Sequence, residues 1–125
     1  MLNHVTRNMI IALSRVKVVG SEPGRLLLRI RGLETARYFF YENEKINLYY
    51  DFYKKYGIKN LEIDPQTSMV LVEYDPSILR EKQIIDLVNR FKELLIEKVV
   101  SRGRRVTGEL FEEIKSILKS EGYER

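Results

Sequence analysis

Residues 58–88 constrain the fold of this chain most, because they alternate in a strand pattern twice and then change to a helical period. Leu61 and Ile63 alternate with polar neighbours, and residues 70–74 repeat the same two-residue period. Residues 64–68 lie between these runs and include Pro65, which has no N–H to donate to a strand ladder. The two runs therefore predict an antiparallel hairpin.

A long helix is predicted after this hairpin. Asp75 suits the N-cap and Pro76 suits the first helical position, so we expect the helix to begin there and to run to Val100. Such a helix is about 35 Å long and the strands span about 20 Å, so the helix overhangs the sheet and needs cover from a final helix. Gly103 and Gly122 are the expected C-terminal stops. The apolar residues on its helical period are Ile84, Leu87, Val88, Phe91, Leu94 and Leu95.

The residues before the hairpin predict two further strands, at 15–19 and 25–31, joined by a turn at 20–24. The order of elements predicts an α+β fold, a ferredoxin-like split βαββα sandwich with an antiparallel sheet, two helices on one face and an extra C-terminal helix. We expect residues 15–19 to take the place of the fourth strand of that fold. In the strand at 25–31, the predicted core face carries Leu26, Leu28 and Ile30, and the predicted basic face carries Arg25, Leu27, Arg29 and Arg31.

Three segments follow from this arrangement: an N-terminal segment at 1–19 with a short helix and an edge strand, a ferredoxin-like domain at 20–97, and a basic loop with the C-terminal helix at 98–125. The helix predicted at 34–56 carries more aromatic residues than one apolar stripe requires. Its second apolar face, with Tyr38, Tyr41 and Phe52, either packs on the C-terminal helix or forms a subunit interface.

Composition excludes several classes of function. Among the 125 residues there is no cysteine and one histidine, His4, which excludes disulfides, thiolate metal sites and cysteine nucleophiles and disfavours a catalytic triad. No apolar run is long enough to cross a bilayer and the first residues do not resemble a signal peptide, so we expect a cytoplasmic protein without membrane contact. The 32% of charged residues is compatible with a thermophilic source.

Three runs of the sequence resemble heavy-metal-associated (HMA-like) domains: PGRLLLRI at 23–30, GIKNLEIDPQT at 57–67 and MVLVEYDP at 69–76. The resemblance covers roughly residues 20–91 and is closest to the divergent branch found near metal-transporting P-type ATPases. It implies a ferredoxin-like fold, a metal-homeostasis setting and a metal-transport ATPase as a partner. The metal-binding members carry a Met-x-Cys-x-x-Cys motif after the first strand, where this chain has Thr35 and Tyr38. The chain therefore departs from the family at its metal site, and we expect no soft-metal binding and no cofactor.

We expect a non-enzymatic protein-interaction module that forms a homodimer or larger assembly. No Gly-rich phosphate loop is present and no nucleophile has a base beside it, which disfavours an enzyme. The open sheet face, with Leu27, Met69 and Leu71, is the second-choice interface. The preferred interface comprises Tyr38, Tyr41, Phe52, Ile96, Val99, Leu110, Phe111, Ile114 and Leu118.

The alternative hypothesis is sequence-independent nucleic-acid binding through a basic C-terminal loop. The formal net charge is +4, and the segment with Lys98, Arg102, Arg104 and Arg105 contains no acidic residue before Glu109. However, the strand positions that carry stacking aromatics in a ferredoxin-like RNA binder are occupied here by arginines, aliphatic residues and a glutamate.

Overall fold

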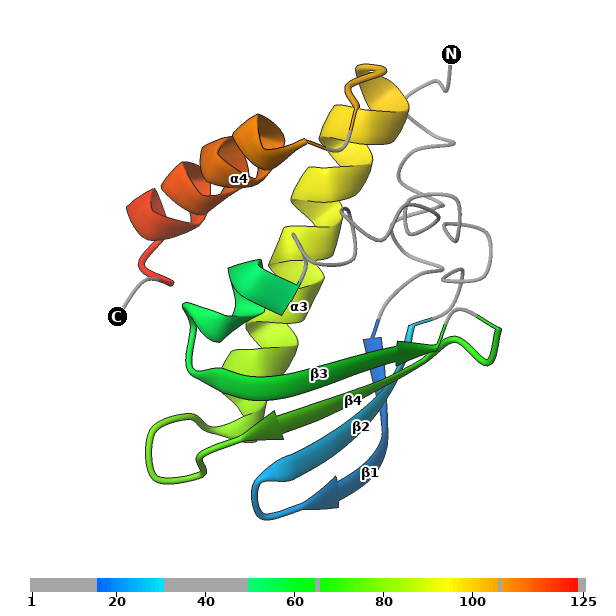
Figure 1. The fold of residues 1–125 in the computed structure, drawn as a ribbon, viewed down its shortest axis with the longest axis vertical. Coiled ribbons are helices and arrows are strands. Elements are labelled where there is room, and N and C mark those ends of the chain that lie inside the picture. The colour runs from blue at the N-terminus through cyan, green and yellow to red at the C-terminus, as the bar shows by residue number, and fades with distance from the viewer. Residues whose placement is uncertain (1–15, 31–49, 65, 106, 124–125) are drawn as a thin grey trace.

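The computed structural model describes residues 16–30, 50–64, 66–105 and 107–123 of the chain (Figure 1). The end of a helix is described at residues 50–54. The helix predicted within residues 2–13 and most of the helix predicted at 34–56 lie outside the described residues. The elements with defined bounds are β1 Val16–Glu22, β2 Arg25–Ile30, β3 Ile58–Asp64, β4 Met69–Tyr74, α3 Glu81–Ile96, the π-helical segment η2 Glu97–Ser101 and α4 Gly108–Ser120.

The strands form one antiparallel sheet in the order β1-β2-β4-β3. This confirms the predicted α+β class and the hairpin of β3 and β4. β1 pairs with β2, as predicted for residues 15–19, and a register shift between Val18 and Gly20 places a bulge in it.

The turn between β1 and β2 is shorter than the predicted turn at 20–24. β1 continues to Glu22, which pairs with Arg25, so that Pro23 and Gly24 alone make the turn. Gly24 allows this tight connection because its φ is 82°, and a Cβ there would lie 3.1 Å from the carbonyl oxygen of Tyr74. The sequence showed the turn residues, but the turn geometry determined how far the strand stays paired.

The two faces of the sheet differ sharply in burial. We call the face toward the helices the inner face and the opposite one the open face. Leu26, Leu28 and Val72 on the inner face have no exposed surface, whereas Leu27 and Leu71 on the open face are only half-buried. Figure 1 shows α3, α4 and the helical residues 50–54 on one side of the sheet. The predicted core face of β2 is thus confirmed for its described residues.

The predicted start of the long helix at Asp75–Pro76 is wrong, because α3 begins at Glu81. The carboxylate of Asp75 accepts hydrogen bonds from the N–H of Ser77 at 2.9 Å and from its hydroxyl at 2.6 Å, which closes a local turn instead. These bonds to Ser77 lower the pKa of Asp75. Arg80 then adopts an extended conformation, and its N–H donates to Oε1 of Gln83 at 2.9 Å at the true helix start.

Both glycine stops are confirmed, although helical structure runs one residue beyond the predicted end, to Ser101. Gly103 has a φ of 68°, and the N–H of Arg104 bonds back to the carbonyl of Lys98 at 3.0 Å. Gly122, with a φ of 89°, ends α4 in the same way. None of the described helices is long and apolar enough to span a membrane.

Aromatic rings from separate elements form the centre of the core. Phe52 lies 4.5 Å from Phe91 of α3 and 5.8 Å from Phe111 of α4, measured between ring centroids. Leu110, Ile114 and Leu118 of α4 are fully buried beside them. Phe52 therefore packs on the C-terminal helix, the first of the two arrangements predicted for the aromatic helix.

Candidate functional site

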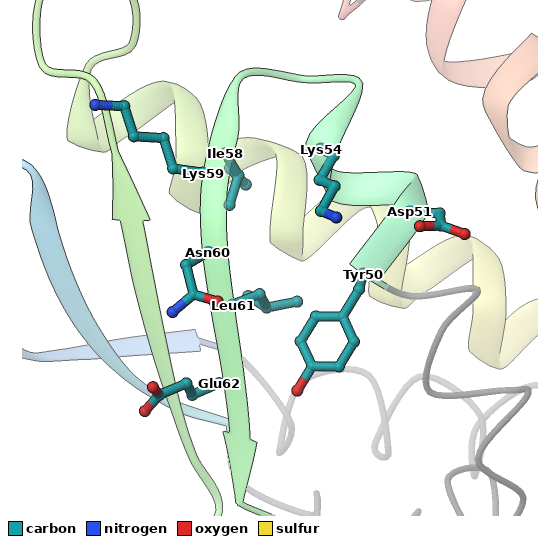
Figure 2. Close-up of a pocket in the computed structure, with 8 residues that line it drawn as sticks. All are labelled: Tyr50, Asp51, Lys54, Ile58, Lys59, Asn60, Leu61 and Glu62. Atoms are coloured by element: carbon teal, nitrogen blue, oxygen red, sulfur yellow. The ribbon is translucent and has the colours of Figure 1, made fainter.

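A groove runs along the β3 edge of the sheet. β3 is the last strand in the sheet order, and the helical residues 50–54 lie beside it (Figure 2). The groove between them has a volume of about 310 Å³. Its lining residues come from these two segments and are Tyr50, Asp51, Lys54, Ile58, Lys59, Asn60, Leu61 and Glu62.

The chain between helix and strand is reversed tightly at Gly57. The N–H of Tyr56 bonds to the carbonyl of Tyr53 at 3.0 Å, and the N–H of Gly57 bonds to that of Lys54 at 3.2 Å. Gly57 has a φ of 91°, and a Cβ there would approach Cδ1 of Leu79 to 3.1 Å. The glycine therefore allows both the left-handed turn before β3 and the close approach of the chain to Leu79.

The lining of the groove is mixed, with three residues that offer apolar surface and five that are polar or charged. Ile58 and Leu61 are buried and form its floor. Figure 2 shows the ring of half-buried Tyr50 next to Leu61 and the side chain of Lys54 between helix and strand, whereas Asp51 points away. The groove thus combines an apolar part, formed by Ile58, Leu61 and the ring of Tyr50, with the ammonium group of Lys54 between helix and strand.

The outer edge of β3 has no strand partner among the described residues, because β3 pairs only with β4. Its register with β4 is regular from Asn60 to Asp64, after a shift between Ile58 and Asn60. Such an edge presents backbone N–H and C=O groups in a row that a further strand can pair with. The side chains of Lys59, Asn60 and Glu62 project to the other side of β3 from Tyr50 (Figure 2). Edge and groove together can hold an extended chain.

The described residues contain no cluster of three or more His, Cys, Asp or Glu side chains that could hold a metal ion. Thr35 and Tyr38, which stand at the cysteine positions of the resembled family, lie outside the described residues. The expected lack of soft-metal binding therefore stays a prediction.

The basic C-terminal loop differs from its predicted form, because acidic side chains distant in sequence reach it. Nη1 of Arg104 lies 2.7 Å and Nζ of Lys98 lies 3.2 Å from the carboxylate of Glu113. These two cations lower the pKa of Glu113. Arg102 contacts Glu97 at 3.5 Å, and Arg105 is exposed. Arg104 is thus half-buried and paired rather than free.

Most residues of the predicted preferred interface are buried within a single chain. Ile96 is 9% exposed, Val99 is half-buried, and Leu110, Phe111, Ile114 and Leu118 are buried. Tyr38 and Tyr41 lie outside the described residues. An α4 exchanged between two copies would make the same contacts, so exchange of this helix stays a prediction.

The groove was missed at the sequence level. The order of the strands would have indicated it, because β3 pairs only with β4, its hairpin partner, and so lies at an edge of the sheet. The position of Gly57 between helix and strand was the second clue.

No protein-family model, curated protein or solved structure matches this chain in the comparisons.

Proposed function

We propose that this chain is a non-enzymatic protein-interaction module that binds an extended segment of a partner protein along β3. The observation that carries the proposal is the outer edge of β3, which no strand of the described residues pairs with, beside a groove of about 310 Å³. In strand addition, backbone hydrogen bonds supply affinity, and alternate side chains of the added strand enter pockets that supply specificity.

The groove chemistry defines the partner segment. A side chain opposite Leu61 would contact that residue and the ring of Tyr50, which favours an apolar residue. A side chain nearer Ile58 would approach the ammonium of Lys54, which favours a carboxylate. Inward-facing residues of a strand are two positions apart. The preferred segment therefore carries an apolar residue and an acidic residue separated by one position.

Within the same proposal, the fold is the ferredoxin-like βαββα sandwich, with β1 in place of its fourth strand. The strand order β1-β2-β4-β3 supports this, since β1 lies beside β2 on the side away from β4. We further propose that the module is an HMA-like domain of the cytoplasm that lost the soft-metal site, with a metal-transport ATPase as its partner class. Nucleic-acid binding is less favoured, because Glu113 and Glu97 contact Lys98, Arg104 and Arg102.

A displayed library of random peptides, panned on the immobilised full chain, tests this proposal. We expect enrichment of peptides with the apolar-x-acidic pattern, and we expect Tyr50→Ala and Lys54→Glu each to weaken their binding at least tenfold. Lys82→Glu is the matched control for charge, because Lys82 is exposed on α3 and does not line the groove.

Backbone amide shifts on titration with a selected peptide locate the binding site. Changes concentrated at residues 60–64 support strand addition to β3. Failure to enrich any peptide, or binding that both groove substitutions leave intact, would contradict the proposal.

A further inference from the structure

The open face of the sheet carries charges in a regular pattern. The registers align Leu27 with Leu71 in the middle of the face and Arg25 with Glu73 in the adjacent row. A third row is formed by Arg29 of β2 and its partner Met69 of β4. Lys17 of β1 pairs with Arg29 and Asp64 of β3 pairs with Met69, so Lys17 and Asp64 lie at the two ends of this row. In this row the face has a cation at the β1 edge and an anion at the β3 edge. The β1 edge also carries Glu22, in the row of Arg25, and the β3 edge also carries Glu62, in the row of the apolar centre.

The charged groups of this pattern are available to a second molecule. Lys17, Arg25 and Asp64 are exposed, and the salt bridges within the described part of the chain involve none of them. Glu73 accepts one hydrogen bond, from the side-chain amide of Asn60 at 3.0 Å. Asp64 uses one carboxylate oxygen to accept the N–H of Gln66 at 3.0 Å and keeps the other free to pair.

We propose that two copies of this chain associate through their open faces, about a two-fold axis that runs parallel to the strands between β2 and β4. This operation places β1 over β3 and β2 over β4 of the second copy. Lys17 then faces Asp64 of the second copy, and Arg25 faces Glu73 of the second copy. Leu27 faces Leu71 of the second copy, and each of these pairs occurs twice by symmetry.

The charge pattern selects this axis over the other symmetric choice. A two-fold axis perpendicular to the strands would place each strand over itself in reverse, with Arg25 facing Arg29 and Glu62 facing Glu62 of the second copy. Like charges that face each other across an interface are strongly unfavourable, so this second axis is disfavoured.

The size of the face limits the strength of this dimer. Strands about 4.8 Å apart with about six residues each give a face of roughly 20 by 20 Å, and a stable dimer buries about 800 Å² of accessible surface per partner. A flat face of this size covers about 400 Å², roughly half of the standard area, so this is a small interface even with the relief of its side chains. A dissociation constant in the micromolar range is therefore expected. The face and the groove share Asn60 and Glu62 of β3, but Lys17 and Asp64 do not line the groove and Tyr50 and Lys54 are not on β strands of the face, so this inference and the proposed function can fail independently.

A pair of charge-reversed variants tests the inference by sedimentation equilibrium on the full chain. Lys17→Glu alone sets a glutamate against Asp64 of the second copy at both symmetry-related contacts. Asp64→Lys alone sets a lysine against Lys17 of the second copy in the same way. Each variant alone is therefore expected to associate at least tenfold more weakly than the wild type. An equimolar mixture restores both ion pairs and is expected to recover association near the wild-type level.

Within one copy Lys17 and Asp64 are separated by two strands, about 14 Å at the usual spacing, so recovery in the mixture can arise only between copies. Circular dichroism verifies that both variants fold. Should Asp64→Lys disturb its turn, Leu71→Lys tests the interface by disruption alone, since it sets a lysine against Leu27 of the second copy at both equivalent contacts and is expected to give a monomer. A wild type that stays at 14.8 kDa at several hundred micromolar would overturn the inference. So would a dimer that none of these substitutions weakens, which would move the interface to an exchanged α4.

Discussion

The inner and open faces of the same sheet show how neighbouring residues of one strand acquire different roles. On β4, Val72 has no exposed surface, whereas Leu71 beside it is half-buried among charged side chains. Both are aliphatic residues of good strand propensity, so their chemistry alone does not distinguish them. The helices make the difference, because they cover one face of the sheet and leave the side chains of the other face partly exposed.

A buried charge is the strongest test of this comparison. Val72→Lys would place an ammonium group without a partner under α3, at a cost of several kcal/mol against a total stability of about 5–15 kcal/mol. We expect that variant to lose cooperative unfolding. Leu71→Lys is the matched control and is expected to fold, since its side chain reaches solvent. Far-UV circular dichroism with urea denaturation measures both, and a Val72→Lys variant with a wild-type midpoint would show that the inner face is not packed as described.

Shortening a leucine side chain on each face of the sheet is expected to give the next largest change in the free energy of unfolding. Leu28→Ala removes a fully buried side chain, which is expected to cost about 2–5 kcal/mol of unfolding free energy. Leu27→Ala, one residue earlier on the open face, is expected to cost about 1 kcal/mol or less at concentrations where the chain is monomeric. Urea denaturation at low micromolar concentration separates the two values. Equal losses would mean that the open face is covered within one chain.

The turn that brings residues 50–54 over the inner face predicts a smaller effect. Gly57→Ala would strain a left-handed residue by about 1–2 kcal/mol and would also push against Leu79. Gly103→Ala is the control, because Gly103 is also left-handed but has no atom within 4 Å of the added Cβ. Thermal or urea unfolding is expected to show a larger loss for Gly57→Ala. A larger loss for Gly103→Ala would contradict the close contact with Leu79.

The sequence predicted the inner face well because its signal is local. The two-residue period of β2 and β4 and the helical period of α3 each follow from residues within a few positions of one another. The start of α3 was mispredicted because Asp75 bonds to Ser77 and closes a turn, which competes with a helix cap at the same residue. Local patterns identify the elements but do not decide between two local hydrogen-bonding choices.

The groove and the ion pairs of the basic loop were not predictable in the same way, because they depend on which elements meet. Glu113 contacts Lys98 and Arg104 only because α4 folds back beside η2. The groove likewise exists only because β3 lies at the sheet edge. Periodicity does not encode these long-range neighbours, so they required the tertiary structure.

The smallest predicted effect concerns the attachment of α4, part of the cover of the inner face. Arg90 of α3 donates from Nε and Nη2 to the two carboxylate oxygens of Glu121, each at 2.7 Å. Arg90 thereby lowers the pKa of Glu121. Because the pKa is lower in the folded state than in the unfolded chain, the stabilisation is present above about pH 4.3 and is lost as pH falls through the folded-state value. Both side chains are about one-third exposed, so the pair is expected to contribute only about 0.5–1 kcal/mol.

Urea denaturation of the wild type, Glu121→Gln, Arg90→Gln and the double variant measures this contribution as a double-mutant cycle. At pH 6 the coupling energy is expected to approach its full value, because Glu121 is ionised in the folded and unfolded chain. At pH 3 the coupling is expected to shrink, because protonation removes the charge that Arg90 binds. Added salt is expected to weaken the coupling at pH 6, since the pair is partly exposed. A coupling of zero at both pH 6 and pH 3 would show that α4 is held by its apolar contacts to the aromatic core alone, with Arg90 and Glu121 contributing no net stability.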